Sequence, residues 1–214
     1  VINEVAWAGT AASSNDEWIE LYNPGTGPIN LAGWILKAID GTPIINLTGS
    51  LAAGGYFLLE RTDNTTVSDI AADQIFTGEI GNSNEILQLF DPSNRLVDSA
   101  NSNGGNWPAG SSTTFGSMER SGVLADSDTA WITNTGVVFW GLDAGIPNDC
   151  TTNPPCTTAP KALKGTPKQA NWAISVTATP SATPTRTAPA PVPTRTQAPV
   201  FAPQPLIAIN EFVP

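Results

Sequence analysis

The feature that most constrains this chain is a series of short apolar-rich runs, separated by turn residues, in its N-terminal half. Each run has about the length of a β-strand, and turn formers lie between the runs, as at Asn23-Pro24-Gly25. Such runs at close spacing predict a β-sandwich or a barrel. We expect strands at residues 1–7, 17–22, 29–39, 56–59, 73–77, 85–90 and 95–99, with a bulge or bend at Gly33.

The composition supports an all-β fold. Charged residues make up only 13% of the 214 residues, whereas Gly and Pro each number 19. Long surface helices need many Lys and Glu residues on their solvent-facing side, while short strands need Gly and Pro in the turns between them. A helical turn is expected only near residues 68–72, because no long segment has an apolar period of 3.6 residues.

Residues 101–172 are irregular and rich in Gly, Asn, Ser and Thr, yet they include many large apolar side chains. Disordered segments rarely contain so many of these. We therefore expect the large side chains to pin long loops and a final pair of strands onto the sandwich. They are Trp107, Phe115, Met118, Trp131, Phe139, Trp140 and Trp172.

The composition changes abruptly after Ser175. Residues 175–205 are dominated by Thr, Ala and Pro, which predicts a semi-rigid, extended tether. In residues 206–214 (LIAINEFVP), the sequence Ile-Asn-Glu of residues 2–4 recurs, as if a second copy of the first strand began there. We therefore expect a folded domain at 1–174, a linker at 175–205 and the first strand of a truncated repeat at 206–214.

The charge and the absence of histidine exclude several functions. The formal net charge is -10, so the surface should repel nucleic acid and anionic lipid. With no histidine, the chain lacks the commonest general base near neutral pH and the commonest metal ligand. No motif of a known nucleophile, phosphate-binding loop or zinc protease is present. We therefore expect no catalytic, cofactor-binding or metal-binding residues and no enzymatic activity.

The two cysteines indicate an oxidising environment. Cys150 and Cys156 are separated by a short Pro-containing loop that can close as a disulfide, and two thiols without histidine fall short of a zinc site. A disulfide favours a secreted or cell-surface protein. Because the chain opens inside a strand-like run, we expect that the natural N-terminus lies upstream of Val1, and a signal peptide there is compatible with the sequence. No run is apolar and long enough to span a membrane.

An acidic group surrounds Trp18. Two carboxylates can perform glycosidase chemistry, and Asp16, Glu17 and Glu20 are the candidates here. On a strand, however, Glu17 faces one side while Trp18 and Glu20 face the other. We therefore expect these acids to anchor a loop or to meet an arginine, for which the candidates are Arg61, Arg95 and Arg120.

Two oxygen-rich segments have the composition of calcium ligands. They are Asp126 with Asp128, and the Asn82-Ser83-Asn84-Glu85 loop. Neither matches a complete calcium-binding loop, so solvated turns are the competing interpretation, and the sequence leaves the choice open.

Several motifs together resemble the lamin tail domain family, over most of residues 1–172. They are Ile2-Asn3-Glu4, residues 16–23 (DEWIELYN), Leu31-Ala32-Gly33-Trp34, residues 51–59 (LAAGGYFLL), Ser117-Met118-Glu119-Arg120, and Gly165-Thr166-Pro167 with Asn171. The last resembles the Gly-Thr-Pro-Gly…Asn ending of bacterial members, except that Lys168 stands where Gly is usual.

The resemblance implies an immunoglobulin-like β-sandwich. In nuclear lamins this domain binds proteins and DNA, and bacterial relatives are typically extracellular, on surface proteins or secreted hydrolases. DNA binding is not expected here because the chain lacks a basic surface. We expect a structural or protein-interaction module of a secreted or cell-surface multidomain protein. The alternative is an accessory domain that binds carbohydrate or another polymer for a neighbouring hydrolase.

Overall fold

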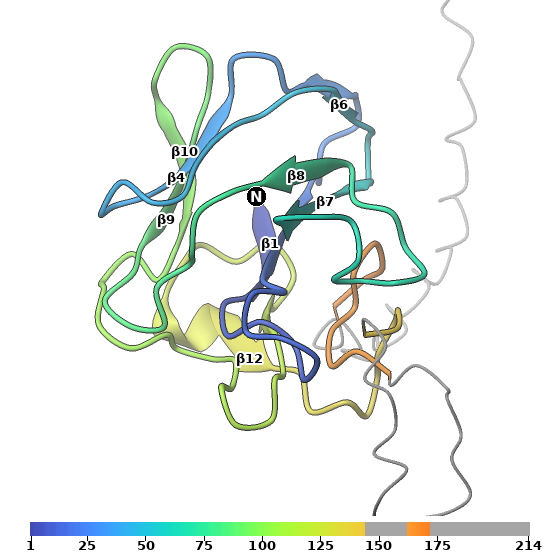
Figure 1. The fold of residues 1–214 in the computed structure, drawn as a ribbon. Coiled ribbons are helices and arrows are strands. Elements are labelled where there is room, and N and C mark those ends of the chain that lie inside the picture. The colour runs from blue at the N-terminus through green and yellow to red at the C-terminus, as the bar shows by residue number, and fades with distance from the viewer. Residues whose placement is uncertain (144–161, 172–214) are drawn as a thin grey trace, which may run out of the picture. The chain divides into compact units, whose positions relative to one another are not determined.

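Alternating side chains along the strands build two sheets that pack face to face (Figure 1). A computed structural model describes residues 1–143 and 162–171. The larger sheet has six strands in the order β12-β11-β1-β2-β7-β8, and only the β7–β8 pair is parallel. Its strands are β1 (Ile2–Ala6), β2 (Trp18–Tyr22), β7 (Tyr56–Arg61), β8 (Gln74–Phe76), β11 (Met118–Arg120) and β12 (Trp131–Thr133).

The smaller sheet has four antiparallel strands in the order β10-β9-β4-β5. They are β4 (Ile35–Ala38), β5 (Ile44–Asn46), β9 (Leu87–Phe90) and β10 (Leu96–Ala100). A separate two-stranded ribbon joins β3 (Ile29–Asn30) to β6 (Ser50–Leu51). The described part of the chain is therefore the all-β sandwich that the sequence predicts, and it contains no helix that could cross a membrane.

The main core lies between the two sheets. Ile19 and Leu21 of β2 face inward and are buried, as are Leu36 of β4 and Leu87 and Leu89 of β9. Their spacing of two residues follows the pleat of a strand. Trp7 and Trp107 extend this core, with stacked rings whose centroids lie 6.3 Å apart.

The six-stranded sheet is covered on its outer face as well. There Trp18, Leu58, Val67 and Leu163 form a second apolar cluster. Leu163 belongs to residues 162–171, hereafter the strap, which is drawn in orange in Figure 1 on the side of β1 and β7 away from β4, β9 and β10. All residues of β1 are therefore buried, whereas β4 alternates between buried and half-exposed positions.

The structure corrects the expected strand at 29–39. This run forms two strands, β3 and β4, in different sheets, because Gly33 adopts a φ of +82° and Trp34 N donates to Leu31 O in a turn. The sequence pattern predicts neither β5 nor β6. At the turn expected near residues 68–72, Ile70 N donates to Val67 O at 3.2 Å in a single turn, and the one helical element among the described residues is a 3-10 turn at Asp128–Ala130.

The expectation for residues 101–172 is partly right. β11 and β12 form the final antiparallel pair, and Trp107, Met118 and Trp131 are buried. Packing was wrongly expected for Phe139 and Trp140, which are 46% and 52% exposed. Trp172, Cys150, Cys156, the tether and residues 206–214 lie outside the described residues. The disulfide and the boundaries at 174 and 205 therefore stay predictions.

Replacing Leu36 by Ala should destabilise the domain by about 2–5 kcal/mol, because the fully buried side chain leaves a cavity between the sheets. The matched control is Ile44→Ala on the neighbouring strand, where the side chain is 56% exposed. Urea denaturation followed by tryptophan fluorescence measures both changes. Equal losses of stability for the two variants would contradict this placement of the core.

Candidate functional site

The acidic group around Trp18 is divided between the two faces of β2, as the sequence predicts. Glu17 pairs with Arg61 at 3.2 Å and accepts a hydrogen bond from Ile80 N at 2.8 Å. Glu20 lies on the other face with Trp18 and anchors the strap. The expected loop-anchoring and arginine-pairing roles are therefore both present, whereas Asp16 accepts a hydrogen bond from Thr10.

Three glutamates form a row across the outer face of the six-stranded sheet. Glu4 of β1 is the cross-strand partner of Glu119 on β11 and of Glu20 on β2. All three side chains are completely buried, and the strap lies over them. A row of buried carboxyl groups is costly unless each is hydrogen-bonded or protonated.

The strap supplies part of the hydrogen-bond donors for this row, and side chains outside the strap, at Asn3, Ser117 and Asn134, supply others. Thr166 N donates to Glu4 at 3.0 Å, Thr166 Oγ1 lies 2.9 Å from a Glu119 oxygen, and Lys168 N donates to Glu20. Asn171 donates to the backbone oxygens of Asn3 and Arg120 at 3.0 and 2.8 Å. The family-like Gly-Thr-Pro…Asn ending is therefore the partner of the glutamate row. The sequence contains both the three glutamates and this ending, but no local pattern in it indicates that they contact each other.

Two strap positions have strict backbone requirements. A Cβ at Gly165 would lie 2.7 Å from a Trp18 ring carbon and 2.8 Å from a Glu4 oxygen, so no larger residue fits. Lys168 has a φ of +60°, the left-handed conformation that glycine adopts most easily. Its side chain pairs with Asp73 at 2.9 Å, a contact that glycine could not make.

Burial raises the pKa of Glu4 and of Glu20. The pKa of Glu20 rises to about 8 through burial, and that of Glu4 rises through burial and the nearby charges of Glu119 and Glu20. The contacts of Thr166 agree with this direction. Its hydroxyl has one proton but lies 2.9 Å from Glu119 and 3.3 Å from Glu4, so a protonated carboxyl group supplies the missing donor. The arrangement holds the strap on the sheet.

Arg120 forms a second buried polar centre at the end of β11. Its guanidinium donates to Ile2 O at 2.6 Å, to Ser99 O at 2.7 Å and to Leu124 O at 2.8 Å. It also pairs with Asp98 at 3.0 Å and lies 4.3 Å from the centre of the Trp131 ring. Arg120 therefore joins β1, β10 and the loop at residues 121–126.

The two segments with calcium-like composition make hydrogen bonds within the domain. Asp126 accepts from Ser99 Oγ, Ser102 N and Trp131 Nε1 at 2.8–2.9 Å. Asp128 accepts from Asn103 at 3.0 Å, and Glu85 from Ile86 N at 2.9 Å. No group of three or more possible metal-ligating side chains occurs within residues 1–143 and 162–171. These contacts make the acids loop anchors.

A groove with both apolar and polar lining residues, among them Asp98, Ser99 and Asp126, lies beside the loop that Arg120 holds. It has a volume of about 430 Å³ and is lined on one side by Leu96 and Val97 of the edge strand β10 and on the other by Val123 and Leu124. These side chains are 43–56% exposed. We call this surface the Val123 groove. No sequence pattern predicts this groove, because residues 96–97 and 123–124 meet only in the folded domain.

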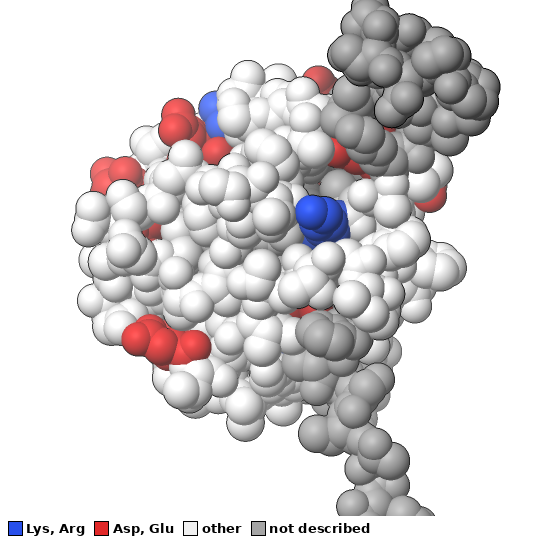
Figure 2. All heavy atoms as spheres, turned by 90° about the horizontal axis from the view of Figure 1, so that it is seen from below, with Lys and Arg blue, Asp and Glu red and all other residues white. Residues whose placement is uncertain are grey.

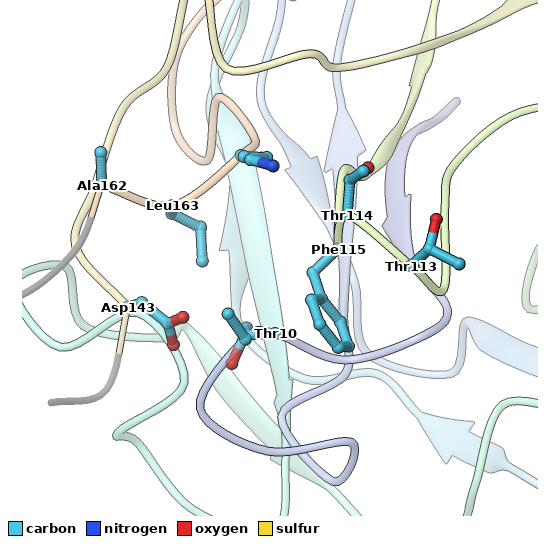
Figure 3. A pocket seen from close by; sticks show the side chains of 9 residues that line it. Thr10, Thr113, Thr114, Phe115, Asp143, Ala162 and Leu163 are labelled. Atoms are coloured by element: carbon cyan, nitrogen blue, oxygen red, sulfur yellow. The ribbon is translucent and has the colours of Figure 1, made fainter. Parts of the chain in front are cut away.

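Another hollow, of about 300 Å³, lies at a different part of the surface (Figure 3). Thr10, Phe115 and Leu163 line it, together with Asp143 and Ala162. The last two residues flank the undescribed positions 144–161. We assign no function to this hollow.

The comparisons with known proteins give one match. Residues 1–104 match the model of a protein family described as Lamin Tail Domain. No curated protein and no solved structure matches the chain.

Replacing Thr166 by Val keeps the shape of the side chain but removes the hydroxyl between Glu4 and Glu119. The domain should lose about 1–3 kcal/mol, since Glu4 and Glu119 each lose one buried hydrogen bond, although Asn134 and the backbone N–H at residue 166 still bind them. Thr114→Val, at an exposed position, is the matched control and should change stability little. If urea denaturation gave the same midpoint for both variants, the strap contacts would not stabilise the fold.

The domain should become less stable as the pH rises from 5 to 8. The folded-state pKa of Glu20, about 8, exceeds its ordinary value of 4.5, so its contribution is complete below pH 4.5 and is lost as the pH approaches 8. Burial also raises the pKa of Glu17 and of Glu60 to about 7. These two groups therefore also make the domain less stable as the pH rises toward 7. Glu20→Gln should remove up to roughly 1.4 kcal/mol per pH unit from this slope. Urea denaturation at several pH values measures it, and an unchanged slope would contradict a protonated Glu20.

Proposed function

Since the folded domain belongs to the lamin tail domain family, a family of non-enzymatic immunoglobulin-like domains, we propose that this chain is a protein-interaction module. The Val123 groove is the observation that supports this function most directly. An exposed apolar surface that combines an edge strand with a neighbouring loop is typical of a docking site for another protein. The buried acids, by contrast, are used within the domain, to hold the strap and the loops.

Arg120 gives the groove a fixed shape. It binds the carbonyl oxygens of Ser99 and Leu124, which lie in the two walls of the groove. Because its guanidinium is buried and paired with Asp98, neither wall can shift without breaking buried contacts. A surface organised before binding loses less conformational entropy when a partner docks.

We place this module outside the cell, in a secreted or cell-surface protein with several domains. Three sequence features support the proposal: the Thr/Pro-rich segment at 175–205, the recurrence of Ile-Asn-Glu at residues 209–211, and the Cys150–Cys156 pair. They favour a modular array with extended linkers in an oxidising environment, as in the bacterial members that the sequence resembles.

Binding of a polysaccharide is the competing function, and the arrangement of aromatic side chains favours it less. The most exposed large aromatic side chains among the described residues are Phe139 and Trp140, which are adjacent in sequence and form no row along a strand. Phe90 lies on the smaller sheet, but Lys37 Nζ covers its ring at 4.5 Å from the ring centre.

The double variant Val123→Lys/Leu124→Lys tests the proposed function, because two charged side chains in the groove should abolish protein binding. Val137→Lys/Val138→Lys, which also replaces two exposed apolar neighbours, is the matched control. A photo-crosslinking residue at Val97 identifies extracellular partners, which are then purified and titrated against the full chain. We expect at least a tenfold loss of affinity for the groove variant and none for the control.

Two results would contradict this proposal. One is equal binding of the purified partner by both double variants. The other is specific binding of the wild-type chain to a glycan array, with or without Ca²⁺, because that result would favour an accessory carbohydrate-binding domain. Circular dichroism and urea denaturation of each variant establish that the fold is intact before binding is compared.

A further inference from the structure

A smaller and more apolar hollow adjoins the Val123 groove at one end of the sandwich. It has a volume of about 230 Å³ and lies where the two sheets separate, between Leu21 of β2, Leu89 of β9 and Trp34. Ile29 and Leu51 of the β3–β6 ribbon close its far side. We call it the Val97 hollow, because Val97 separates it from the groove.

The hollow and the groove form a continuous surface. Val1 and Val97 line both of them, and Val97 is 43% exposed. A polypeptide segment lying in the groove along Leu96 and Val97 therefore passes the mouth of the hollow. One of its side chains can enter the hollow while its neighbours contact Val123 and Leu124.

The volume indicates which kind of group fits. Sites for small molecules and cofactors usually have volumes of about 300–1,000 Å³, so a hollow of about 230 Å³ suits one large side chain better. Its lining is almost entirely apolar, which favours Trp, Phe, Leu or Met. Deep apolar pockets that accept a single anchoring side chain are where the binding energy of protein interfaces concentrates.

The charge of the domain indicates what surrounds the anchoring residue. The chain has a formal net charge of -10, and Asp98 and Asp126 line the groove. Because Arg120 pairs with Asp98 and the ammonium group of Val1 lies in the same lining, the attraction for a partner comes from the net charge of the chain. On the face drawn in Figure 2, acidic side chains are more widespread than basic ones. A second copy of this acidic chain would be repelled, whereas a segment with Lys or Arg would be attracted and oriented.

From these features we propose that the Val123 groove and the Val97 hollow together bind an extended segment of a partner protein that carries one large apolar anchor residue with Lys or Arg nearby. This inference rests on the proposed protein-interaction function and specifies its partner. The anchor residue enters the Val97 hollow, and the basic residues lie over the groove.

Panning a random peptide library, displayed on phage, against the full chain tests this specificity. We expect the enriched peptides to share a Trp, Phe, Leu or Met with Lys or Arg within about three positions. In titrations with the synthetic peptides, replacing the anchor by Ala should weaken binding at least tenfold, about 1.4 kcal/mol. Replacing Lys or Arg by Glu should weaken binding further at low salt and less at high salt.

A matched pair of variants locates the anchor on the protein. Val97→Trp should fill the mouth of the hollow and weaken peptide binding at least tenfold, whereas Val138→Trp, at a position of equal 43% exposure, should not. Selected peptides without an apolar anchor, peptides that bind equally well with Glu beside the anchor, or unchanged binding by Val97→Trp would overturn the inference.

The experiment also separates this inference from the function on which it rests. If Val123→Lys/Leu124→Lys abolishes peptide binding and Val97→Trp does not, the groove binds proteins but the hollow takes no anchor. If neither variant affects binding, both proposals are wrong.

Discussion

The buried guanidinium of Arg120 is the interaction on which both the sandwich and its candidate surface depend. It binds the backbone oxygens of Ile2 and Ser99, which belong to strands of different sheets. Burying a cation is costly, and the cost is offset here by Asp98, by several carbonyl acceptors and by the ring of Trp131. Because β1, β10 and the loop at residues 121–126 all bind this guanidinium, Arg120 determines how the two sheets join beside the Val123 groove.

The outer face of the larger sheet presents the opposite electrostatic problem. Glu4, Glu20 and Glu119 are buried side by side, where ionised carboxylates would repel one another. Protonation and the donors of the strap solve this problem together, and the strap in turn depends on the small size of Gly165. The glutamates therefore act in the fold as hydrogen-bonding partners for a distant segment. This use gives a structural role to acids whose residue type alone is also that of catalytic carboxylates.

The proposed function rests on the surface that Arg120 and the glutamate row leave exposed, which is the Val123 groove. The strap covers the outer face of the six-stranded sheet, whereas Arg120 holds Leu124 beside the edge strand β10 with its apolar side chain in solvent. Apolar side chains held rigidly at the surface gain free energy when another protein covers them. The acidic character of the chain then restricts which partners can approach.

The sequence by itself determined the fold class and most strands, because the two-residue period of β2, β7 and β9 is set locally by the pleat. It also determined the structural role of Glu17 and Glu20, since strand geometry places them on opposite faces. Only the tertiary structure decided the division of residues 29–39 between two sheets, the pairing of the glutamate row with residues 165–171, and the meeting of Val97 with Leu124. These depend on contacts between residues far apart in the chain, which local periodicity does not specify.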